Sequence, residues 1–371
     1  MVVVTVTHRL NVFGFLHLEE IAGAAFAGGG NAGMLDCVAA LEWVRDNITG
    51  FGGDPRNVTI FGESGGAGKV STLMAMPSAR GLFHRAIAES GAALTHATRE
   101  QANAAAKALL DQLCLQPADV SRLQSLPFQD ILAAMGKVRL PGAFQPMVDG
   151  HGIPNNPFDP TAPAMSADIP FMTGTNLTEA TFLPDTPLEP MDDGALLAKV
   201  KSYVHVGDDD AARLIALYRA DYPGLDNVFV FQLLASDSWM RAQVLLQADR
   251  KAAQGRAPVY VYQFNRLSPA RSGRLHCPHG SEIPFVFDNL DTAPEIIGPP
   301  QGPQPLADVM SAAWVAFART GDPNAGSGGL RWPAYDARRA VMVFDDQSRV
   351  VNDPGGKSRA ALVALKNRPA A

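Results

Sequence analysis

A predicted strand, a glycine-rich turn and a predicted helix follow one another around residue 64. Residues 57–61 are mostly apolar and β-branched, and helical spacing runs over residues 65–76. The turn at residues 62–66 reads Gly-Glu-Ser-Gly-Gly. Its glycines permit a tight, strained turn that lifts the Ser64 hydroxyl clear of a sheet. We interpret Ser64 as a nucleophile, and a serine that only caps the helix is the alternative.

A nucleophilic serine needs a base and an acid that orients the base. The start of the helix would place Ser64 in a positive field, and the Gly65 N–H is a candidate donor to an oxyanion. In a strand–turn–helix site of this kind the chain order is serine, acid, histidine. Glu179 and His279 each follow a predicted strand in that order, and His276 is the competing base.

Predicted strands alternate with predicted helices along the whole chain. This alternation indicates an α/β fold with a largely parallel sheet covered on both faces, of the α/β-hydrolase type. Helical stretches at about 97–140 and 190–253 are too long for plain crossovers, so we expect insertions that form pocket walls in a single domain over residues 1–371. The strands are predicted at residues 2–7, 58–61, 86–89, 169–174, 258–264 and 341–344.

The predicted strand at residues 2–7 opens the chain with a β-branched run. A buried strand of this kind needs neighbours on both sides. We therefore expect that the chain lacks the usual N-terminal strands, and that the exposed edge left at residues 2–7 promotes association between copies.

Composition excludes several classes of function. The formal net charge is −6 and no block of Lys or Arg is present, so a nucleic-acid partner is not expected. The three cysteines match no zinc spacing, and the pair His276 and His279 has no accompanying ligand set, so neither a metal nor a cofactor is expected. No stretch has the roughly 18 apolar residues of a membrane span, and no signal peptide is recognisable, which predicts a cytoplasmic location.

A series of ordered motifs resembles the type-B carboxylesterases, which include the cholinesterases and bacterial para-nitrobenzyl esterases. The resemblance implies that Ser64 is the nucleophile, Glu179 the acid and His279 the base, because His279 is followed by Gly and then Glu282. Around Glu179 the family usually has a glycine where this chain has Ala180. The matching segments are residues 8–16, 30–36, 43–48, 51–55, 62–66, 81–87, 148–150, 174–176, 279–282, 320–324 and 332–333.

The resemblance also indicates roles for two neighbouring residues. Glu63 would stabilise the protonated imidazole, or it would be a buried acid with a structural role only. Ser90 would lie beside the acid, or it would be an ordinary serine at the end of a strand.

These patterns predict a serine hydrolase that cleaves small carboxylic esters through an acyl-enzyme, without a cofactor. The alternative is a catalytically impaired protein with a binding or remnant role, because the family's His-Gly-Gly oxyanion loop does not occur in this sequence.

Overall fold

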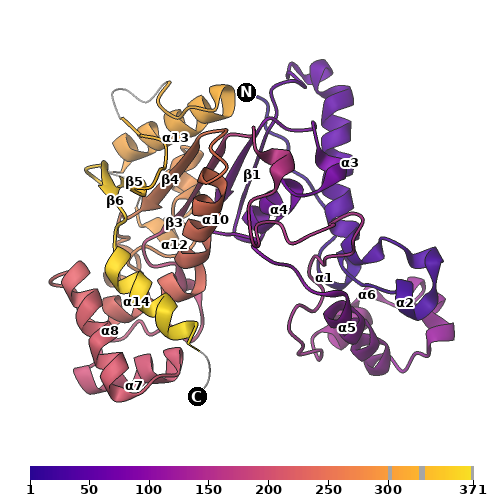
Figure 1. Ribbon diagram of the computed structural model, residues 1–371, viewed down its shortest axis with the longest axis horizontal. Helices are drawn as coiled ribbons and strands as arrows, with labels where there is room; N and C mark the ends of the chain where they lie inside the picture. The colour runs from indigo at the N-terminus through magenta and orange to yellow at the C-terminus, as the bar shows by residue number, and fades with distance from the viewer. Residues whose placement is uncertain (300–302, 326–330, 369–371) are drawn as a thin grey trace. The chain divides into compact units, whose positions relative to one another are not determined.

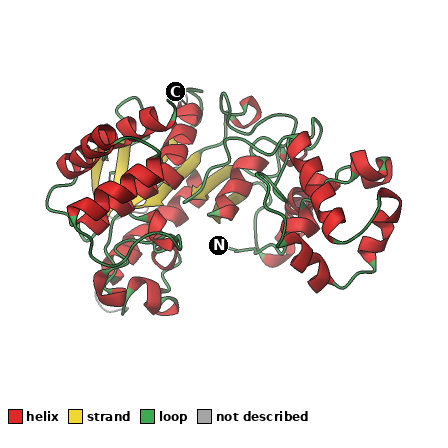
Figure 2. Ribbon diagram, turned by 90° about the horizontal axis from the view of Figure 1, so that it is seen from below, coloured by secondary structure: helices red, strands yellow, loops and turns green. Residues whose placement is uncertain are grey.

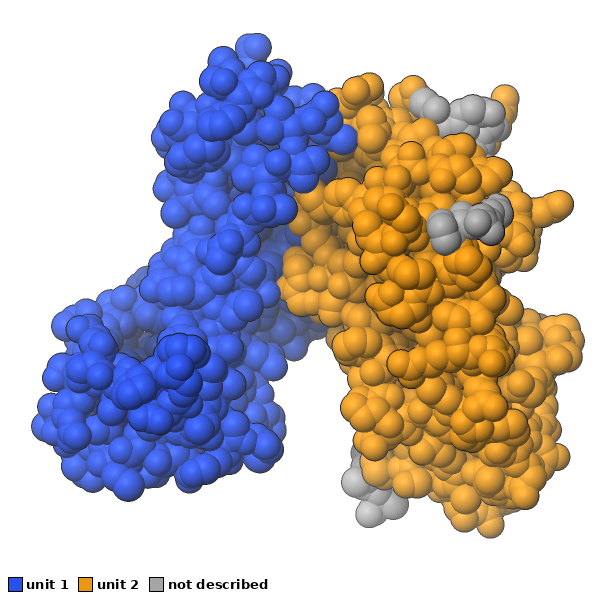
Figure 3. Space-filling model, turned by 180° about the vertical axis from the view of Figure 1, so that it is seen from behind, with its two compact units in different colours: residues 1–60, 69–84, 93–168 blue, residues 61–68, 85–92, 169–371 orange. Residues whose placement is uncertain are grey.

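The computed structural model describes residues 1–299, 303–325 and 331–368. Two compact units can be distinguished by their internal contacts (Figure 3). Unit 1 contains Met1–Ile60, Lys69–His84 and Ala93–Asp168. Unit 2 contains Phe61–Gly68, Arg85–Ala92 and the chain from Ile169 onward. The expectation of a single domain stays a prediction.

A six-stranded sheet has the strand order β1-β2-β3-β4-β5-β6 (Figure 1). The ladders from β2 to β5 are parallel, and β6 returns antiparallel to β5. Every residue of β3, β4 and β5 is buried, as a sheet covered on both faces requires. The strands are β1 (Thr59–Glu63), β2 (Arg85–Glu89), β3 (Phe171–Asn176), β4 (Val259–Phe264), β5 (Ala340–Phe344) and β6 (Arg349–Asn352).

Two helices of unit 2 cover opposite faces of the sheet. Side chains alternate between faces along β4. Val261 lines a small cavity together with Val244 of α10 (Ala242–Ala252). Tyr262 points the other way, with its ring centroid 5.0 Å from that of Trp314 on α13 (Gln304–Thr320). Figure 2 shows helices on both sides of the strands, which confirms the predicted α/β fold.

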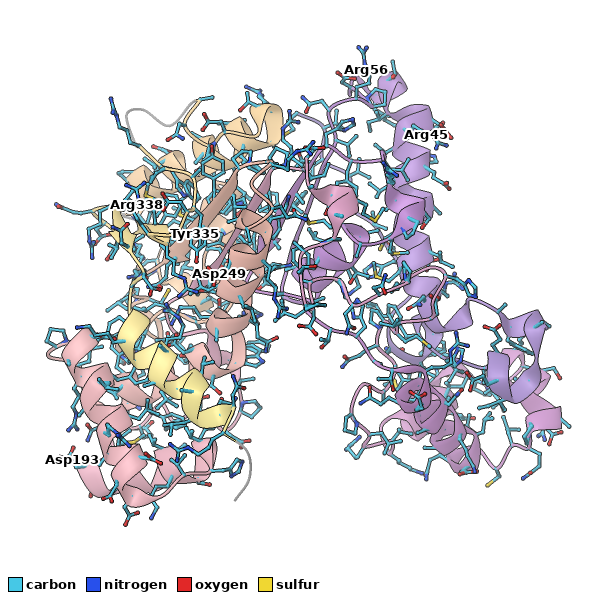
Figure 4. All side chains as sticks on the ribbon, in the orientation of Figure 1. Arg45, Arg56, Asp193, Asp249, Tyr335 and Arg338 are labelled. Atoms are coloured by element: carbon cyan, nitrogen blue, oxygen red, sulfur yellow. The ribbon has the colours of Figure 1, made fainter. Side chains whose placement is uncertain are left out.

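Tyr335 connects α10 to the chain that leads into β5. Its hydroxyl donates to Asp249 Oδ1 of α10 at 2.8 Å, and the two residues are labelled in Figure 4. Its backbone N–H donates to the carbonyl of Val259 at 2.7 Å, at the start of β4. Tyr335 thus connects helix α10, which covers one face of the sheet, to the start of strand β4.

The remaining helices of unit 2 include the second predicted helical stretch. Its core is built from buried aromatic and aliphatic side chains such as Tyr218, Phe231 and Phe264. The helices are α7 (Asp193–Val204), α8 (Asp208–Asp221), α9 (Asn227–Ser236), a π-helical turn (Asp237–Arg241), α11 (Ile283–Val286), α12 (Pro294–Ile297) and α14 (Gly356–Lys366).

Unit 1 contains the first predicted helical stretch, which packs around Leu109 and Leu110. That both stretches are helical is confirmed, and their role as pocket walls stays a prediction. No helix in the described part of the chain is long and apolar enough to cross a bilayer. The helices are α1 (Asn11–Gly14), α2 (Glu19–Ala22), α3 (Ala32–Asn47), α5 (Arg99–Gln112), a 3₁₀ segment (Pro117–Gln124) and α6 (Phe128–Met135), with α4 (Gly65–Leu73) beginning in unit 2.

The predicted strand at residues 2–7 is wrong. These residues form no strand, and the Val3 side chain is 55% exposed. A β-branched run becomes a strand only when another strand supplies hydrogen bonds, and no described strand pairs with it.

The short strand β6, by contrast, was not predicted. It forms because the chain turns back at Asp345–Ser348, where Ser348 Oγ donates to the Asp345 carbonyl at 3.1 Å.

Candidate active site

Ser64 occupies the turn between β1 and α4, so the strand and helix predicted around it are both present. Its φ is +55°, a conformation that L side chains rarely adopt, and its N–H donates to the Glu89 carbonyl at 2.8 Å. A Cβ on Gly62 would lie 2.6 Å from the Gly66 carbonyl carbon. One on Gly91 would lie 2.4 Å from the Ser64 carbonyl oxygen. Glycine is therefore required at both positions for this strained turn to close.

Glu179 and His279 are directly hydrogen-bonded, although 100 residues separate them. Glu179 follows β3, is 0% exposed, and its Oε2 lies 2.5 Å from His279 Nδ1. A carboxylate only accepts hydrogen bonds, so Nδ1 carries the proton. The rings of Phe182 and Trp239 lie beside the imidazole, with centroid distances of 5.4 and 5.2 Å. The orientation of His279 is thus set by one bond and two ring contacts.

The second oxygen of Glu179 is also held. The Ser90 hydroxyl donates to Glu179 Oε1 at 2.7 Å, and the Asn176 N–H donates to the same atom at 2.6 Å. Ser90 directly follows β2 and has a φ of +49°. The structure therefore places Ser90 beside the predicted acid rather than at an uninvolved strand end.

Glu63 lies on the other side of the imidazole. Its Oε1 is 3.0 Å from His279 Nε2. This oxygen makes no hydrogen bond within the described part of the chain, so the contact is one of charge without hydrogen-bond geometry. Among the described residues, no hydrogen bond joins the Ser64 hydroxyl to His279 either. The structure thus pairs Glu179 with His279, and Glu63 occupies the vicinity of the nitrogen that would face Ser64.

The two groups at Nε2 have shifted pKa values. Burial raises the pKa of Glu63 to about 7, with Glu282 and Glu179 adding to the rise and His279 opposing it. Burial disfavours the charged form of His279, but the hydrogen bond and charge of Glu179, with the charges of Glu63 and Glu282, outweigh it and raise its pKa. Glu63 therefore changes protonation near neutral pH, while the pKa of His279 lies above its ordinary value.

Glu282 is a member of the site to which the sequence assigned no role. It is 0% exposed and accepts from Asn176 Nδ2 at 2.5 Å and Tyr262 Oη at 3.2 Å, and Ser90 Oγ lies 3.2 Å from its Oε1. Burial and the charge of Glu179 raise its pKa. Its position three residues after His279 in the matched motif was the only signal in the sequence.

Glu89 is a further buried acid that the sequence did not point to. It is 3% exposed, and its Oε1 accepts from Trp314 Nε1 at 2.6 Å. Burial, with the charges of Glu282 and Glu63, raises the pKa of Glu89 to about 8. Its place at the end of β2, next to Ser90, was the only indication available.

His276 lies apart from the acid. Its Nδ1 is 2.5 Å from Gln232 Oε1, and its ring stacks on Phe229 with a centroid distance of 3.9 Å. The structure thus separates the two candidate bases, because only His279 contacts Glu179. Within residues 1–299, 303–325 and 331–368, no group of three or more His, Cys, Asp or Glu is arranged to hold a metal ion.

Comparisons with known proteins show the family to which the chain belongs. A family model described as "Carboxylesterase family" matches residues 1–361. The chain belongs to this family. It is 33% identical to the para-nitrobenzyl esterase of Bacillus subtilis (strain 168) over 99% of its length and 73% of the relative's. It is 33% identical to the human cocaine esterase, covering 94% of this chain but 64% of that protein, which is less than two thirds.

Solved carboxylesterase structures share the fold. The carboxylesterase EST55 of Geobacillus stearothermophilus superimposes with a TM-score of 0.79 at 37% identity, covering 96% of this chain and 74% of that one. An esterase from Clostridium hathewayi gives a TM-score of 0.80 at 34% identity, covering 97% and 72%. Membership confirms the predicted activity, hydrolysis of small carboxylic esters by a serine hydrolase. The alternative of a catalytically impaired protein receives no support.

Proposed function

We propose that Ser64, His279 and Glu179 perform the ester hydrolysis of this family as nucleophile, base and acid. The hydrogen bond of 2.5 Å between His279 Nδ1 and Glu179 Oε2 is the observation that carries the proposal. It holds the proton on Nδ1 and leaves the Nε2 lone pair to accept one. The strained turn at Ser64, with its φ of +55°, supports the role of the hydroxyl as nucleophile.

The reaction follows from these roles. His279 Nε2 takes the Ser64 proton as the serine oxygen bonds to the ester carbonyl carbon. When the tetrahedral intermediate collapses, the C–O bond to the alcohol breaks and His279 returns the proton to that alcohol. Water then attacks the acyl-enzyme with the same base, and the acid and free Ser64 are released.

Glu63 interacts with the base during this cycle. Its oxygen lies 3.0 Å from Nε2, the nitrogen that must also accept the Ser64 proton. Ser64 must therefore approach Nε2 beside Glu63, whose negative charge stabilises the imidazolium once it has formed. The Gly65 N–H, at the first residue of α4, is our proposed donor to the oxyanion.

Two further expectations stay predictions of the sequence: the lack of a nucleic-acid partner and a cytoplasmic location. Association between copies also stays a prediction, but residues 2–7 do not form the strand whose edge was expected to mediate it.

The test compares wild type with Ser64→Ala in hydrolysis of para-nitrophenyl butyrate and in labelling by a fluorophosphonate. We expect kcat to fall by roughly 10⁴- to 10⁶-fold in Ser64→Ala. Mass spectrometry should find the label on Ser64 in wild type. Ser125→Ala, at an exposed serine, is the matched control and should keep the wild-type rate. A folded wild type that is not labelled, or a Ser64→Ala variant that keeps its rate, would overturn these assignments.

A further inference from the structure

A π-helical turn interrupts the long helical segment between α9 and α10. It comprises Asp237–Arg241, and its two end residues are 1% and 2% exposed. Single π turns occur mostly inside α-helices and often at functional sites. Trp239, within this turn, is the residue whose ring lies 5.2 Å from that of His279. The turn therefore contacts the proposed base directly.

The Arg241 guanidinium binds the segment that leads from β3 to Glu179. Its Nη2 donates to the carbonyls of Asn176 at 2.8 Å and Leu177 at 2.6 Å. Its Nε donates to Thr175 Oγ1 at 3.2 Å. Its Nη1 pairs with Asp237. One side chain thus fixes three consecutive residues before the acid.

The same helical segment also holds the residue that follows Glu179. The Ala180 N–H donates to Ser236 Oγ at 3.0 Å, and Ser236 Oγ donates in turn to the Gln232 carbonyl at 2.6 Å. Ala180 directly follows Glu179, in the loop whose conformation decides where the carboxylate points. The helical segment from α9 to α10 therefore binds the loop both before and after Glu179.

The chemistry of these contacts needs arginine. Burying an ion pair is costly, and apolar side chains of similar volume often stabilise a protein as much. A guanidinium has five donors in a fixed plane, whereas an ammonium cannot reach Asp237 and two carbonyls in that geometry. Arg241 uses three of its nitrogens on these partners. These partners thus require donors that point in fixed directions as well as a positive charge.

We propose that Arg241, paired with Asp237, is a positioning residue that holds the Glu179 loop so that the carboxylate meets His279 Nδ1. This inference rests on the proposed function, because it gives Arg241 a role through the proposed acid. A purely structural ion pair would stabilise the fold and leave the chemistry of His279 unchanged.

A second buried arginine provides a matched control. Arg359 is 4% exposed and pairs with Asp353, and its Nη1 donates to the Pro354 carbonyl at 2.8 Å. Its hydrogen bonds are made at the start of α14 and not to the Glu179 loop. Replacing it removes a buried guanidinium without releasing the proposed acid.

The experiment measures kcat, KM, the pH dependence of kcat/KM and thermal unfolding for wild type, Arg241→Lys and Arg359→Lys, with para-nitrophenyl butyrate as substrate. We expect both variants to unfold at lower temperature. In Arg241→Lys, kcat should fall about 10- to 100-fold with KM within about twofold, because a displacement of about 1 Å at the acid has this effect. The acid limb should also move to lower pH, since Glu179 raises the pKa of His279 together with Glu63 and Glu282.

Two results would overturn the proposal. One is an Arg241→Lys variant that loses stability like Arg359→Lys but keeps the wild-type kcat and pH profile. The second variant, Ser236→Ala, decides the case if Arg241→Lys does not fold. We expect Ser236→Ala to lower kcat several-fold while the ion pair between Arg241 and Asp237 stays intact. An unchanged kcat and an unchanged pH profile of kcat/KM in this variant are the other overturning result. An inactive wild type, or an active Ser64→Ala, would instead refute the proposed function.

Discussion

The two sides of the His279 imidazole differ in how their carboxylates are held. On the Nδ1 side, Glu179 is fully buried and accepts hydrogen bonds from His279, from Ser90 at 2.7 Å and from the Asn176 N–H at 2.6 Å. On the Nε2 side, the Glu63 side chain is 21% exposed, and its Oε1 lies 3.0 Å from His279 without a hydrogen bond.

Because their surroundings differ, the two glutamates Glu179 and Glu63 have different properties although both lie beside the same imidazole. Three hydrogen-bond donors hold the Glu179 carboxylate in place, so it is positioned to orient the base. Glu63 is partly desolvated without such donors, which raises its pKa to about 7. We therefore expect the Nδ1 side to be preorganised and the Nε2 side to respond to pH.

The largest effect that this comparison predicts is on Glu179. Glu179→Gln should lower kcat/KM by roughly 10³- to 10⁴-fold, because an amide no longer holds the Nδ1 proton in place. Hydrolysis of para-nitrophenyl butyrate measures it, with Glu189→Gln, at an exposed carboxylate paired with Arg274, as the control. A loss of less than tenfold would show that the Nδ1 side is not the preorganised one.

A smaller effect is expected when only a donor to Glu179 is removed. Ser90→Ala deletes the hydrogen bond of 2.7 Å and leaves the Asn176 N–H in place. We expect kcat to fall about tenfold, since a hydrogen bond to a charged group contributes roughly 1.5–3 kcal/mol and one donor remains. Steady-state kinetics with a check of folding by circular dichroism measures this, and an unchanged kcat would contradict it.

On the Nε2 side we expect a shift in pH rather than a large loss. Glu63→Gln removes a negative charge that favours the imidazolium, so the pKa of His279 should fall. The acid limb of kcat/KM should move to lower pH, with kcat at pH 8 within about tenfold of wild type. An acid limb that stays in place would mean that Glu63 does not interact with the base in solution.

The smallest effect on activity is expected at Glu89, where stability is the informative measurement. Its folded pKa of about 8 lies above its ordinary value near 4.5, so the folded state binds the extra proton between these values. Stability is therefore lost as the pH rises through this window. Glu89→Gln mimics the neutral acid beside Trp314, and its urea unfolding should depend less on pH than that of wild type. An equally steep dependence in both would refute the assignment.

The local parts of the site could be predicted from the sequence. The turn at Ser64 depends on glycines within a few residues, and the buried strand β4 (Val259–Phe264) reads as a run that is apolar except for Gln263. The order of Ser64, Glu179 and His279 along the chain also suggested the site. The turn and the strands are determined by neighbouring residues, which is why a single sequence reveals them, whereas the acid and the base were assigned from their order along the chain and from the family resemblance.

The rest was decided by the tertiary structure. The valine-rich run at residues 2–7 resembles β4 in composition but forms no strand, because β4 has strands bonded to both of its edges, whereas no described strand pairs with residues 2–7. Trp314 meets Glu89 across 225 residues of sequence, and Arg241 reaches the carbonyls before Glu179 through a π turn. Such contacts depend on strand register and helix packing, which bring together residues that no local pattern connects.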